Sequence, residues 1–209
     1  MIPSETSAQL RARVQQKRRG LSSLERARIE TILDAKFLEF LRATPALRPG
    51  GVWAIHRPLP WEWRLPRSLE FLRQSHIRLA YPRMRDLANR QMGMAWSVVD
   101  ERHAQDWRPC PGMKALLEPH ELLPEVDPAT FDGVWVPGVA FSERGERIGA
   151  GGGFYDTFLG QFPALFRVAV AAEFQVFSSL PDQRPDEPRM SVIVSESSVR
   201  FFDTTCERS

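Results

Sequence analysis

The stretch that decides the fold is Arg147-Ile148-Gly149-Ala150-Gly151-Gly152-Gly153-Phe154-Tyr155-Asp156. Four of the five positions from 149 to 153 are glycine, and the apolar run 154–161 that follows is typical of a helix. A strand, a glycine cluster and a helix in succession direct several backbone N–H groups at an anion. A glycine cluster is also compatible with a flexible turn, so the surrounding sequence has to discriminate between the two.

The residues before the cluster predict the strand that leads into it. Residues 132–141, Asp-Gly-Val-Trp-Val-Pro-Gly-Val-Ala-Phe, are typical of a buried strand that breaks at Pro137. The loop between this strand and the glycines is short. The order strand, loop, glycine cluster and helix therefore favours an anion-binding loop.

The composition indicates one domain, residues 1–209, with an ordinary hydrophobic core. Hydrophobic residues make up 43% of the chain and charged residues 26%, and the net charge of +2 does not by itself indicate a nucleic-acid-binding protein. Cys110 and Cys206 are the only cysteines, which excludes a disulfide framework and a cysteine-rich zinc site. No segment reaches the ~18 apolar residues of a membrane span, and the N-terminus lacks a secretion signal. We therefore expect a cytoplasmic protein.

The first 44 residues predict two helices. Ser4 or Thr6 can cap the first, which Gly20 ends, and Ser22 with Glu25 forms a capping box for the second. An apolar stripe on the second helix must face the core; it contains Ile29, Ile32, Leu33, Phe37, Phe40 and Leu41.

The first helix is rich in cationic side chains, among them Arg11, Arg13, Lys17, Arg18 and Arg19. Such a run is usually a solvated face. It can also serve as a cationic arm for a polyphosphate. A DNA-contacting arm is the weakest interpretation, because no nucleic-acid recognition fold accompanies it.

A second candidate site follows the predicted strand 51–56. Residues 57–63 form a loop with two prolines at the carboxyl end of that strand, where open α/β sheets bind ligands. Glu62 lies between Trp61 and Trp63, and a carboxylate between aromatic walls suits a flat ligand with ring N–H groups. Alternatively the tryptophans belong to the core and Glu62 is solvated.

The remaining elements alternate between strands and helices. We predict a helix at 67–74 and strands at 77–81, 91–99, 166–171, 192–195 and 199–202, with a loop from 100 to 128. The strand–helix–strand unit predicts parallel pairing. The sum is a three-layer α/β/α domain with six or seven strands in a mainly parallel sheet. His56, His76, His103 and His120 show no metal-ligand spacing and are interpreted as structural or surface residues.

Several common motifs are excluded. The glycine spacing does not fit the dinucleotide-binding fingerprint, because the third required glycine falls on Phe154 or Asp156. No Gly-Lys-Ser/Thr follows as in a P-loop, and no nucleophile elbow is present.

The stretch does resemble another motif. Residues 136–141, Gly145 and the segment Arg147 to Asp156 are similar to the signature of the 5-formyltetrahydrofolate cyclo-ligase family, also called 5,10-methenyltetrahydrofolate synthetases. The similarity extends over most of the chain in the same order. It includes Leu10-Arg11, Leu21-Ser22-x-x-Glu25-Arg26, Leu59-Pro60-x-Glu62, Glu118-Pro119 and an acidic segment from Pro181 to Glu196.

The resemblance implies a single α/β domain of the NagB/RpiA/CoA-transferase type, with helices 1–44 packed on the core. It implies an enzyme that uses Mg²⁺ and ATP to convert 5-formyltetrahydrofolate to 5,10-methenyltetrahydrofolate, with release of ADP and phosphate. The formyl oxygen takes the γ-phosphoryl group, N10 attacks the activated carbon, and phosphate leaves. It further implies a cytoplasmic monomer without a nucleic-acid or membrane partner.

The resemblance also implies residue roles. Arg147 and Tyr155 would be catalytic. The ATP site would comprise Arg11, Arg147, Ile148, Gly149, Ala150, Gly151, Gly152, Gly153, Phe154 and Tyr155. The folate would contact Glu62, Trp61, Arg11 and Tyr155, and the metal would be held by Asp156 and Glu187. In a purely structural interpretation, Phe154 and Tyr155 anchor the helix and Asp156 is a first-turn residue.

Four departures from the family pattern leave an alternative open. Ser7 stands where a lysine is usual, Ala150 where an arginine is usual, and Thr157 where an arginine often follows the Tyr-Asp pair. In the tail, Glu187 and Ser191 replace aspartates. Loss of two phosphate contacts could weaken ATP handling by two to four powers of ten, on the basis of ~1.5–3 kcal/mol for each charged hydrogen bond. The alternative is a non-catalytic or altered-specificity folate- or nucleotide-binding paralogue.

Overall fold

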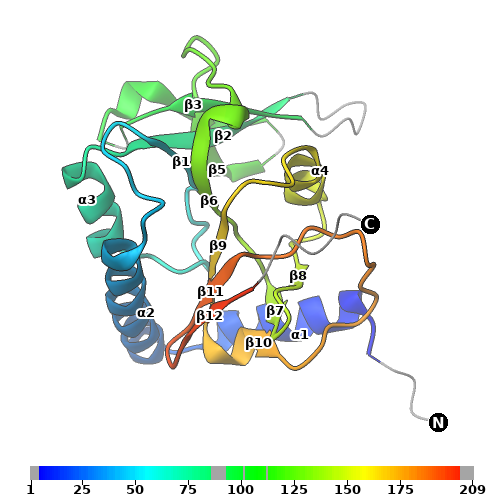
Figure 1. The fold of residues 1–209 in the computed structure, drawn as a ribbon. Coiled ribbons are helices and arrows are strands. Elements are labelled where there is room, and N and C mark those ends of the chain that lie inside the picture. The colour runs from blue at the N-terminus through cyan, green and yellow to red at the C-terminus, as the bar shows by residue number, and fades with distance from the viewer. Residues whose placement is uncertain (1–4, 86–92, 101, 112, 203–209) are drawn as a thin grey trace.

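The centre of the molecule is a seven-stranded sheet in the order β12-β11-β9-β6-β1-β2-β3 (Figure 1). The structure is a computed structural model and describes residues 5–85, 93–100, 102–111 and 113–202 of the chain. The strands of this sheet are β1 (Val52–Ala54), β2 (Arg78–Arg85), β3 (Gly93–Val98), β6 (Phe131–Trp135), β9 (Arg167–Val170), β11 (Val192–Val194) and β12 (Val199–Phe201).

The pairing of these strands is mainly parallel, as predicted. Strands β2, β1, β6, β9 and β11 pair in parallel, and β3 and β12 close the two edges in antiparallel orientation. The β1–α3–β2 unit has the predicted parallel register, with Trp53 opposite Leu79. The carboxyl ends of the five parallel strands therefore lie along one edge of the sheet.

Helices cover both faces of the sheet, which confirms the predicted three-layer fold. Helices α2 (Ser23–Ala43) and α3 (Pro66–Gln74) lie on one face, and α4 (Phe154–Gln161) lies on the other (Figure 1). Because side chains alternate along a strand, Trp53 packs with the α2 layer while its neighbours Val52 and Ala54 pack with the α4 layer.

The N-terminal helices begin where their caps predict. Thr6 caps α1 (Ser7–Gly20) and forms a capping box with Gln9; the other candidate cap, Ser4, lies outside the described residues. Ser22 and Glu25 form the predicted box at α2. In the apolar stripe of α2, four residues are buried and two are half-buried: Leu33, Phe37, Phe40 and Leu41, then Ile29 and Ile32.

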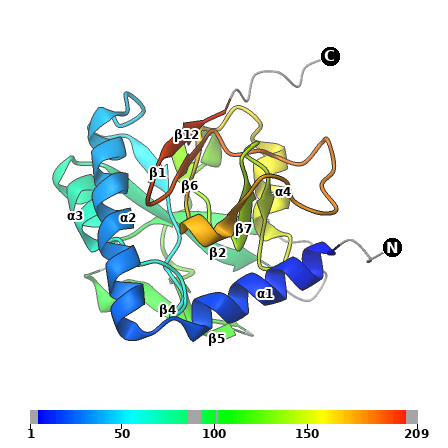
Figure 2. The ribbon, with the colours of Figure 1, turned by 90° about the horizontal axis from the view of Figure 1, so that it is seen from below.

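Helix α1 packs on a small three-stranded sheet in the order β10 (Val176–Phe177), β7 (Ala140–Ser142) and β8 (Arg147–Ile148). Leu10 and Val14 of the helix are buried against Val139, Ala140 and Ile148. Figure 2 shows α1 crossing the molecule beside β7. The strand that precedes the glycine loop is thereby fixed to the N-terminal helix.

The prediction of a loop from 100 to 128 was wrong. This segment contains a hairpin of β4 (Trp107–Cys110) and β5 (Met113–Pro119). The prolines of this segment argued against strands. A two-stranded hairpin, however, consists of edge strands only, and an edge strand tolerates a residue without an N–H group. The cross-strand pair of Arg108 and buried Glu118, at 2.9 Å, holds the hairpin together.

Two strand boundaries also differ from the prediction. Strand β1 is shorter than 51–56. Strand β2 continues four residues beyond Tyr81 because it pairs with β3 from Ala80 to Arg85. The predicted strand 91–99 corresponds to β3, and its first residues lie outside the described part of the chain.

Candidate active site

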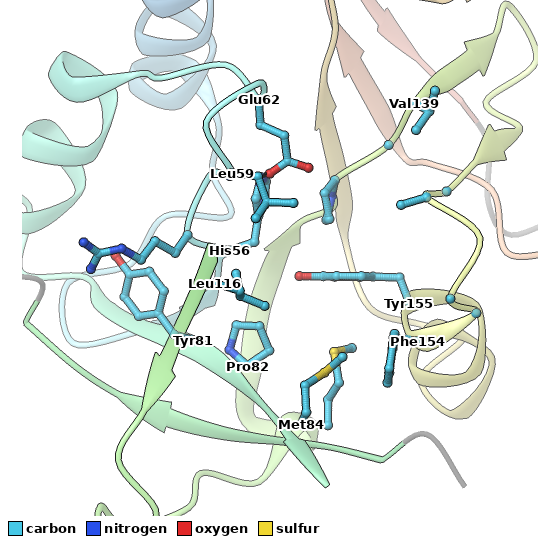
Figure 3. A pocket seen from close by; sticks show the side chains of 18 of the residues that line it. His56, Leu59, Glu62, Tyr81, Pro82, Met84, Leu116, Val139, Phe154 and Tyr155 are labelled. Atoms are coloured by element: carbon cyan, nitrogen blue, oxygen red, sulfur yellow. Dashed lines mark hydrogen bonds and ion pairs between the residues drawn. The ribbon is translucent and has the colours of Figure 1, made fainter. Parts of the chain in front are cut away.

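An open cavity with mostly apolar walls lies at the carboxyl ends of β1 and β6 (Figure 3). It is bounded by the loop after β1, by β2 and β3, by the hairpin β4–β5 and by the glycine loop. The lining residues are His56, Arg57, Leu59, Glu62, Tyr81, Pro82, Met84, Met94, Trp107, Leu116, Leu117, Pro137, Gly138, Val139, Arg147, Gly149, Ala150, Gly152, Gly153, Phe154, Tyr155 and Asp156. Both stretches that the sequence singled out thus meet at one cavity.

The glycine loop has a defined backbone conformation. Gly151 has a φ of 106° and Gly153, the N-cap of α4, a φ of 71°, values that side-chain-bearing residues rarely adopt. Within the described residues, the N–H groups of Ala150, Gly151 and Gly152 donate no hydrogen bond. A Cβ at Gly152 would lie 2.8 Å from the Phe154 ring. The loop therefore presents unpaired amide donors next to the N-terminus of α4.

The side chain of Arg147 packs against this loop. Its buried guanidinium donates to the carbonyl oxygen of Pro137 at 3.1 Å and pairs with the carboxylate of Asp156. Burial lowers the pKa of Arg147, and the negative charge of Asp156 opposes that change. A Cβ at Gly149 would lie 2.7 Å from the same guanidinium, so a larger residue at this position would displace the end of the Arg147 side chain.

Helix α1 reaches the glycine loop through Arg11. The Nε atom of Arg11 donates to the carbonyl oxygen of Gly149 at 2.9 Å, and the guanidinium also lies beside Gly151. At the start of the helix, Ser7 donates from its N–H group to the carboxylate of Asp182 at 2.8 Å and from Oγ to the carbonyl oxygen of Pro181 at 2.9 Å. The acidic proline loop is thereby attached to the helix that carries Arg11.

Tyr155 extends from α4 across the cavity, with its hydroxyl directed toward the β1 side (Figure 3). The hydroxyl is buried and has no hydrogen-bond partner among the described residues. Burial strongly raises the pKa of this phenol, and the charge of Glu62 adds to the effect. A neutral donor is therefore directed into the cavity, and an unpaired buried hydroxyl is a costly arrangement in the absence of a ligand.

Glu62 lies across the cavity from the glycine loop. Its Oε2 atom accepts from the N–H group of Leu59 at 2.9 Å, and the Nε2 atom of His56 is 3.9 Å from the same oxygen. The two flanking tryptophans do not line the cavity. Trp63 is buried and donates to Gln175 at 2.6 Å, whereas the ring of Trp61 lies under the guanidinium of Arg19.

The loop that carries Glu62 is held by a buried arginine that the sequence did not single out within the basic run. Arg18 donates from Nε to the carbonyl oxygen of Trp61 at 3.1 Å and lies 3.5 Å from the carbonyl oxygen of Gly138. Burial lowers the pKa of Arg18, and Glu62 opposes this shift. Arg18 therefore connects α1 to both sides of the cavity.

The two residues expected to hold a metal are not in contact. Asp156 is half-exposed in the first turn of α4 and pairs with Arg147. Glu187 pairs with Arg184 at 3.1 Å and does not line the cavity, although its charge acts on Arg147. Across the described ranges, no group of three or more His, Cys, Asp or Glu residues is arranged to hold a metal.

Two further parts of the site were not predicted from the sequence. His56, interpreted as structural or at the surface, lines the cavity beside Glu62. The signal for it was its position at the carboxyl end of a buried strand. The wall formed by the hairpin β4–β5, with Leu116 and Leu117, was not predicted, because the segment 100–128 has no clear strand pattern in the sequence.

The fold and the site together define a three-layer α/β protein with an anion-binding glycine loop at the mouth of an apolar cavity. Residues 3–195 match the model of the 5-formyltetrahydrofolate cyclo-ligase family, and the chain belongs to this family of ligases.

Several known proteins are similar to this chain in sequence or in structure. The chain is 23% identical over 189 residues to a 5-formyltetrahydrofolate cyclo-ligase of Mycoplasma pneumoniae, covering 90% of this chain and 96% of that protein. It is 34% identical over 100 residues to the cyclo-ligase of Saccharomyces cerevisiae, covering 44% and 46% of the two chains. The solved structure of Aquifex aeolicus 5,10-methenyltetrahydrofolate synthetase superimposes with a TM-score of 0.73 at 28% identity, covering 97% and 95%. None of the described helices is both long and apolar enough to cross a membrane.

Proposed function

We propose that the protein converts 5-formyltetrahydrofolate to 5,10-methenyltetrahydrofolate at the cost of ATP, which becomes ADP and phosphate. Family membership supports the reaction. One observation supports placing this reaction in the cavity. Two facing walls carry different polar groups: unpaired amides of the glycine loop on one side and the Glu62 carboxylate on the other. One wall suits a polyphosphate and the other a flat ring with N–H donors.

The ATP phosphates bind at the glycine loop in this proposal. The N–H groups of residues 149–153 donate to phosphate oxygens, and Arg11 and Arg147 neutralise part of the charge. Ile148 ends β8 and fixes the start of the loop, and Phe154 covers Gly152. Because no Cβ stands between the loop and the ligand, the backbone can approach the phosphates closely.

The folate ring binds between Glu62 and the apolar walls. Glu62 accepts hydrogen bonds from the ring N–H groups, while Leu59, Met84 and Leu116 exclude water from the faces of the ring. Trp61 contributes indirectly, because its carbonyl oxygen is the anchor that Arg18 holds.

The reaction is a phosphoryl transfer followed by ring closure. The formyl oxygen attacks the γ-phosphorus and the bond to ADP breaks. N10 then attacks the activated carbon and loses its proton to the departing phosphate as the C–O bond breaks. Tyr155 remains a neutral donor because burial raises its pKa, so its hydroxyl can stabilise negative charge on the transferring oxygens. Arg147 supplies a fixed positive charge on the same side.

The residues present are compatible with Mg²⁺, which neutralises phosphate charge when it is bound. Mg²⁺ is usually held by one or two carboxylates together with substrate phosphates and waters rather than by a closed protein cage. Asp156 would be the direct ligand, and Glu187 would act from the adjoining acidic loop. One carboxylate at the glycine loop, with a second in the adjoining loop, is compatible with this mode.

The protein acts as a cytoplasmic monomer without a nucleic-acid partner in this proposal. The cationic side chains of α1 are engaged within the molecule rather than aligned for a phosphate backbone. Arg13 pairs with Glu5, Lys17 lies over Phe174, and Arg19 lies over Trp61.

The test is a turnover assay that follows the near-ultraviolet absorbance of methenyltetrahydrofolate. Product should form only when protein, ATP, Mg²⁺ and 5-formyltetrahydrofolate are all present. Omission of each component in turn provides the controls. Absence of product at high protein concentration, with intact binding of either substrate, would contradict the proposed reaction.

Ser7 and Ala150 allow the non-catalytic alternative to be tested in the same assay. Ser7 donates hydrogen bonds to Asp182 and Pro181. Ala150 lines the cavity, but its side chain carries no charge. Ala150→Arg should lower the KM for ATP by roughly tenfold or more, because a charged hydrogen bond contributes ~1.5–3 kcal/mol. Ser7→Lys should act in the same direction. A wild-type protein that binds substrates without turnover, but gains activity in the double variant, would establish the alternative.

A further inference from the structure

His56 and Glu62 lie side by side on the wall of the cavity (Figure 3). Glu62 has a role in the proposed reaction, whereas the neighbouring His56 has none. The imidazole is nearly buried, with its side chain 11% exposed, and its ring packs edge-on against Trp135 at 4.9 Å. Its position is therefore fixed by the core rather than by solvent.

The surroundings of His56 determine which ring nitrogen carries the proton. Nδ1 lies 3.3 Å from the carbonyl oxygen of Trp135, and a carbonyl oxygen can only accept a hydrogen bond. The proton of the neutral ring is therefore on Nδ1. Burial lowers the pKa of His56, and the charged groups that face it, Glu62 and Arg18, oppose each other. At neutral pH the Nε2 atom therefore carries no proton and can accept a hydrogen bond.

Nε2 accepts no hydrogen bond from the residues that the structure describes. Nε2 is 3.9 Å from Oε2 of Glu62, which is too long for a hydrogen bond, and both atoms are acceptors. Oε2 already accepts from Leu59, whereas Oε1 accepts no hydrogen bond from the described residues. The cavity thus contains two neighbouring acceptors, Nε2 of His56 and Oε1 of Glu62, that need donors from a ligand.

We propose that His56 is a second hydrogen-bond acceptor for the folate ring and a determinant of specificity for it. The inference rests on the function proposed above. The aminopyrimidinone edge of the folate ring carries a ring N–H group next to an exocyclic amino group, and two adjacent donors match two adjacent acceptors. A ring that lacks the amino group leaves one buried acceptor unpaired, which is the arrangement by which polar sites reject analogues.

Two variants of similar size separate this role from packing. His56→Gln places a carbonyl oxygen near the position of Nε2, whereas His56→Asn retains an amide near Nδ1 but does not reach the cavity. His56→Asn should raise the KM for 5-formyltetrahydrofolate about tenfold and leave kcat and the KM for ATP within about twofold. His56→Gln should keep the folate KM within about threefold of wild type. An unchanged folate KM in His56→Asn, or equal losses for both substrates in both variants, would overturn the proposal.

A measurement on the wild-type protein covers the case in which the variants fail to fold. ¹⁵N NMR should show the Nδ1–H tautomer of His56 in the free protein, and addition of 5-formyltetrahydrofolate should shift the Nε2 resonance in the direction of a hydrogen-bonded acceptor. ATP alone is the control and should leave it in place. A folate complex with no change at Nε2 overturns the proposal.

Wild-type turnover is measured first, so that the two hypotheses fail separately. Without turnover the cyclo-ligase reaction is contradicted, and the calorimetric Kd for 5-formyltetrahydrofolate replaces the KM in comparing the variants. With turnover, a folate KM that does not respond to His56→Asn contradicts the role of His56 alone.

Discussion

At the scale of single residues, the site is a set of polar groups whose partners are incomplete within the described chain. The hydroxyl of Tyr155, the amides of the glycine loop and the Nε2 atom of His56 all face one cavity. Unpaired buried polar groups cost free energy of folding, so a protein retains them where a ligand completes the hydrogen bonds. Stability and activity should therefore respond in opposite directions to their removal.

Tyr155→Phe tests this opposition. Removal of the hydroxyl should leave the free energy of unfolding unchanged or raise it by up to about 1 kcal/mol, because the hydroxyl has no hydrogen-bond partner among the described residues. The same change should lower kcat by about 10–100-fold if the hydroxyl stabilises charge on the transferring oxygens. Urea denaturation and the turnover assay measure the two effects. A variant that is clearly destabilised, or one with full activity, would show that the hydroxyl has another role.

The titration of His56 gives a pH dependence of stability. Burial lowers its pKa in the folded state below the ordinary value of 6.5, so the unfolded chain binds the proton more tightly. This contribution is complete above about pH 6.5 and is lost as the pH falls below it. Wild type should therefore lose more stability between about pH 7.5 and pH 5 than His56→Gln does. Urea denaturation of both proteins at each pH provides the comparison, and identical pH dependence would contradict it.

At the scale of elements, caps and local contacts determine where the site-bearing helices begin. Gly153 caps α4 with a left-handed backbone, and Thr6 and Ser22 cap α1 and α2 through their side chains. These signals are local in the sequence, which is why the helix starts were predictable. The hairpin β4–β5 has no such signal, because its prolines obscure the alternation that reveals a strand.

The cap of α2 is a structural device separate from the cavity. Ser22→Ala removes the acceptor for the N–H group of Glu25 and should lower the free energy of unfolding by about 1 kcal/mol. Ser23→Ala is the matched control, because Ser23 is exposed and makes no side-chain hydrogen bond in the described residues. Both variants should keep wild-type values of kcat and KM. A loss of activity in Ser22→Ala would mean that α2 positions the site directly.

At the scale of the whole molecule, elements that are distant in the sequence together form the boundary of the cavity. Helix α1 contacts the glycine loop through Arg11, the Glu62 loop through Arg18 and the acidic proline loop through Ser7. A ligand in the cavity should therefore stabilise the protein as one unit, since N-terminal and C-terminal segments contact the same site.

Thermal unfolding with ligands tests this coupling. ATP with Mg²⁺ at about 100 times its Kd should add about 2.7 kcal/mol of stability, which raises the Tm by roughly 5–10 °C in a domain of this size. A metal chelator should remove most of this shift, and Asp156→Asn should reduce it. Mg²⁺ without nucleotide is the control and should have little effect. A nucleotide shift that survives the chelator would contradict the metal role of Asp156.

The sequence by itself determined what depends on local pattern. The glycine loop and its following helix, the two N-terminal helices and their caps, and the alternation of strands and helices all follow from short-range signals. The position of Glu62 at the carboxyl end of a strand also follows from such signals. The motif around residues 136–156 indicates the family by sequence alone.

Only the tertiary structure decided which of these residues share a surface. His56 is inconspicuous in the sequence and becomes a cavity residue because β1 ends beside Glu62. Arg18 differs from its basic neighbours only because it is buried between Trp61 and Gly138, and Trp61 itself lies outside the cavity. The direction of a side chain depends on packing between elements far apart in the chain. Such contacts leave no regular spacing in the sequence.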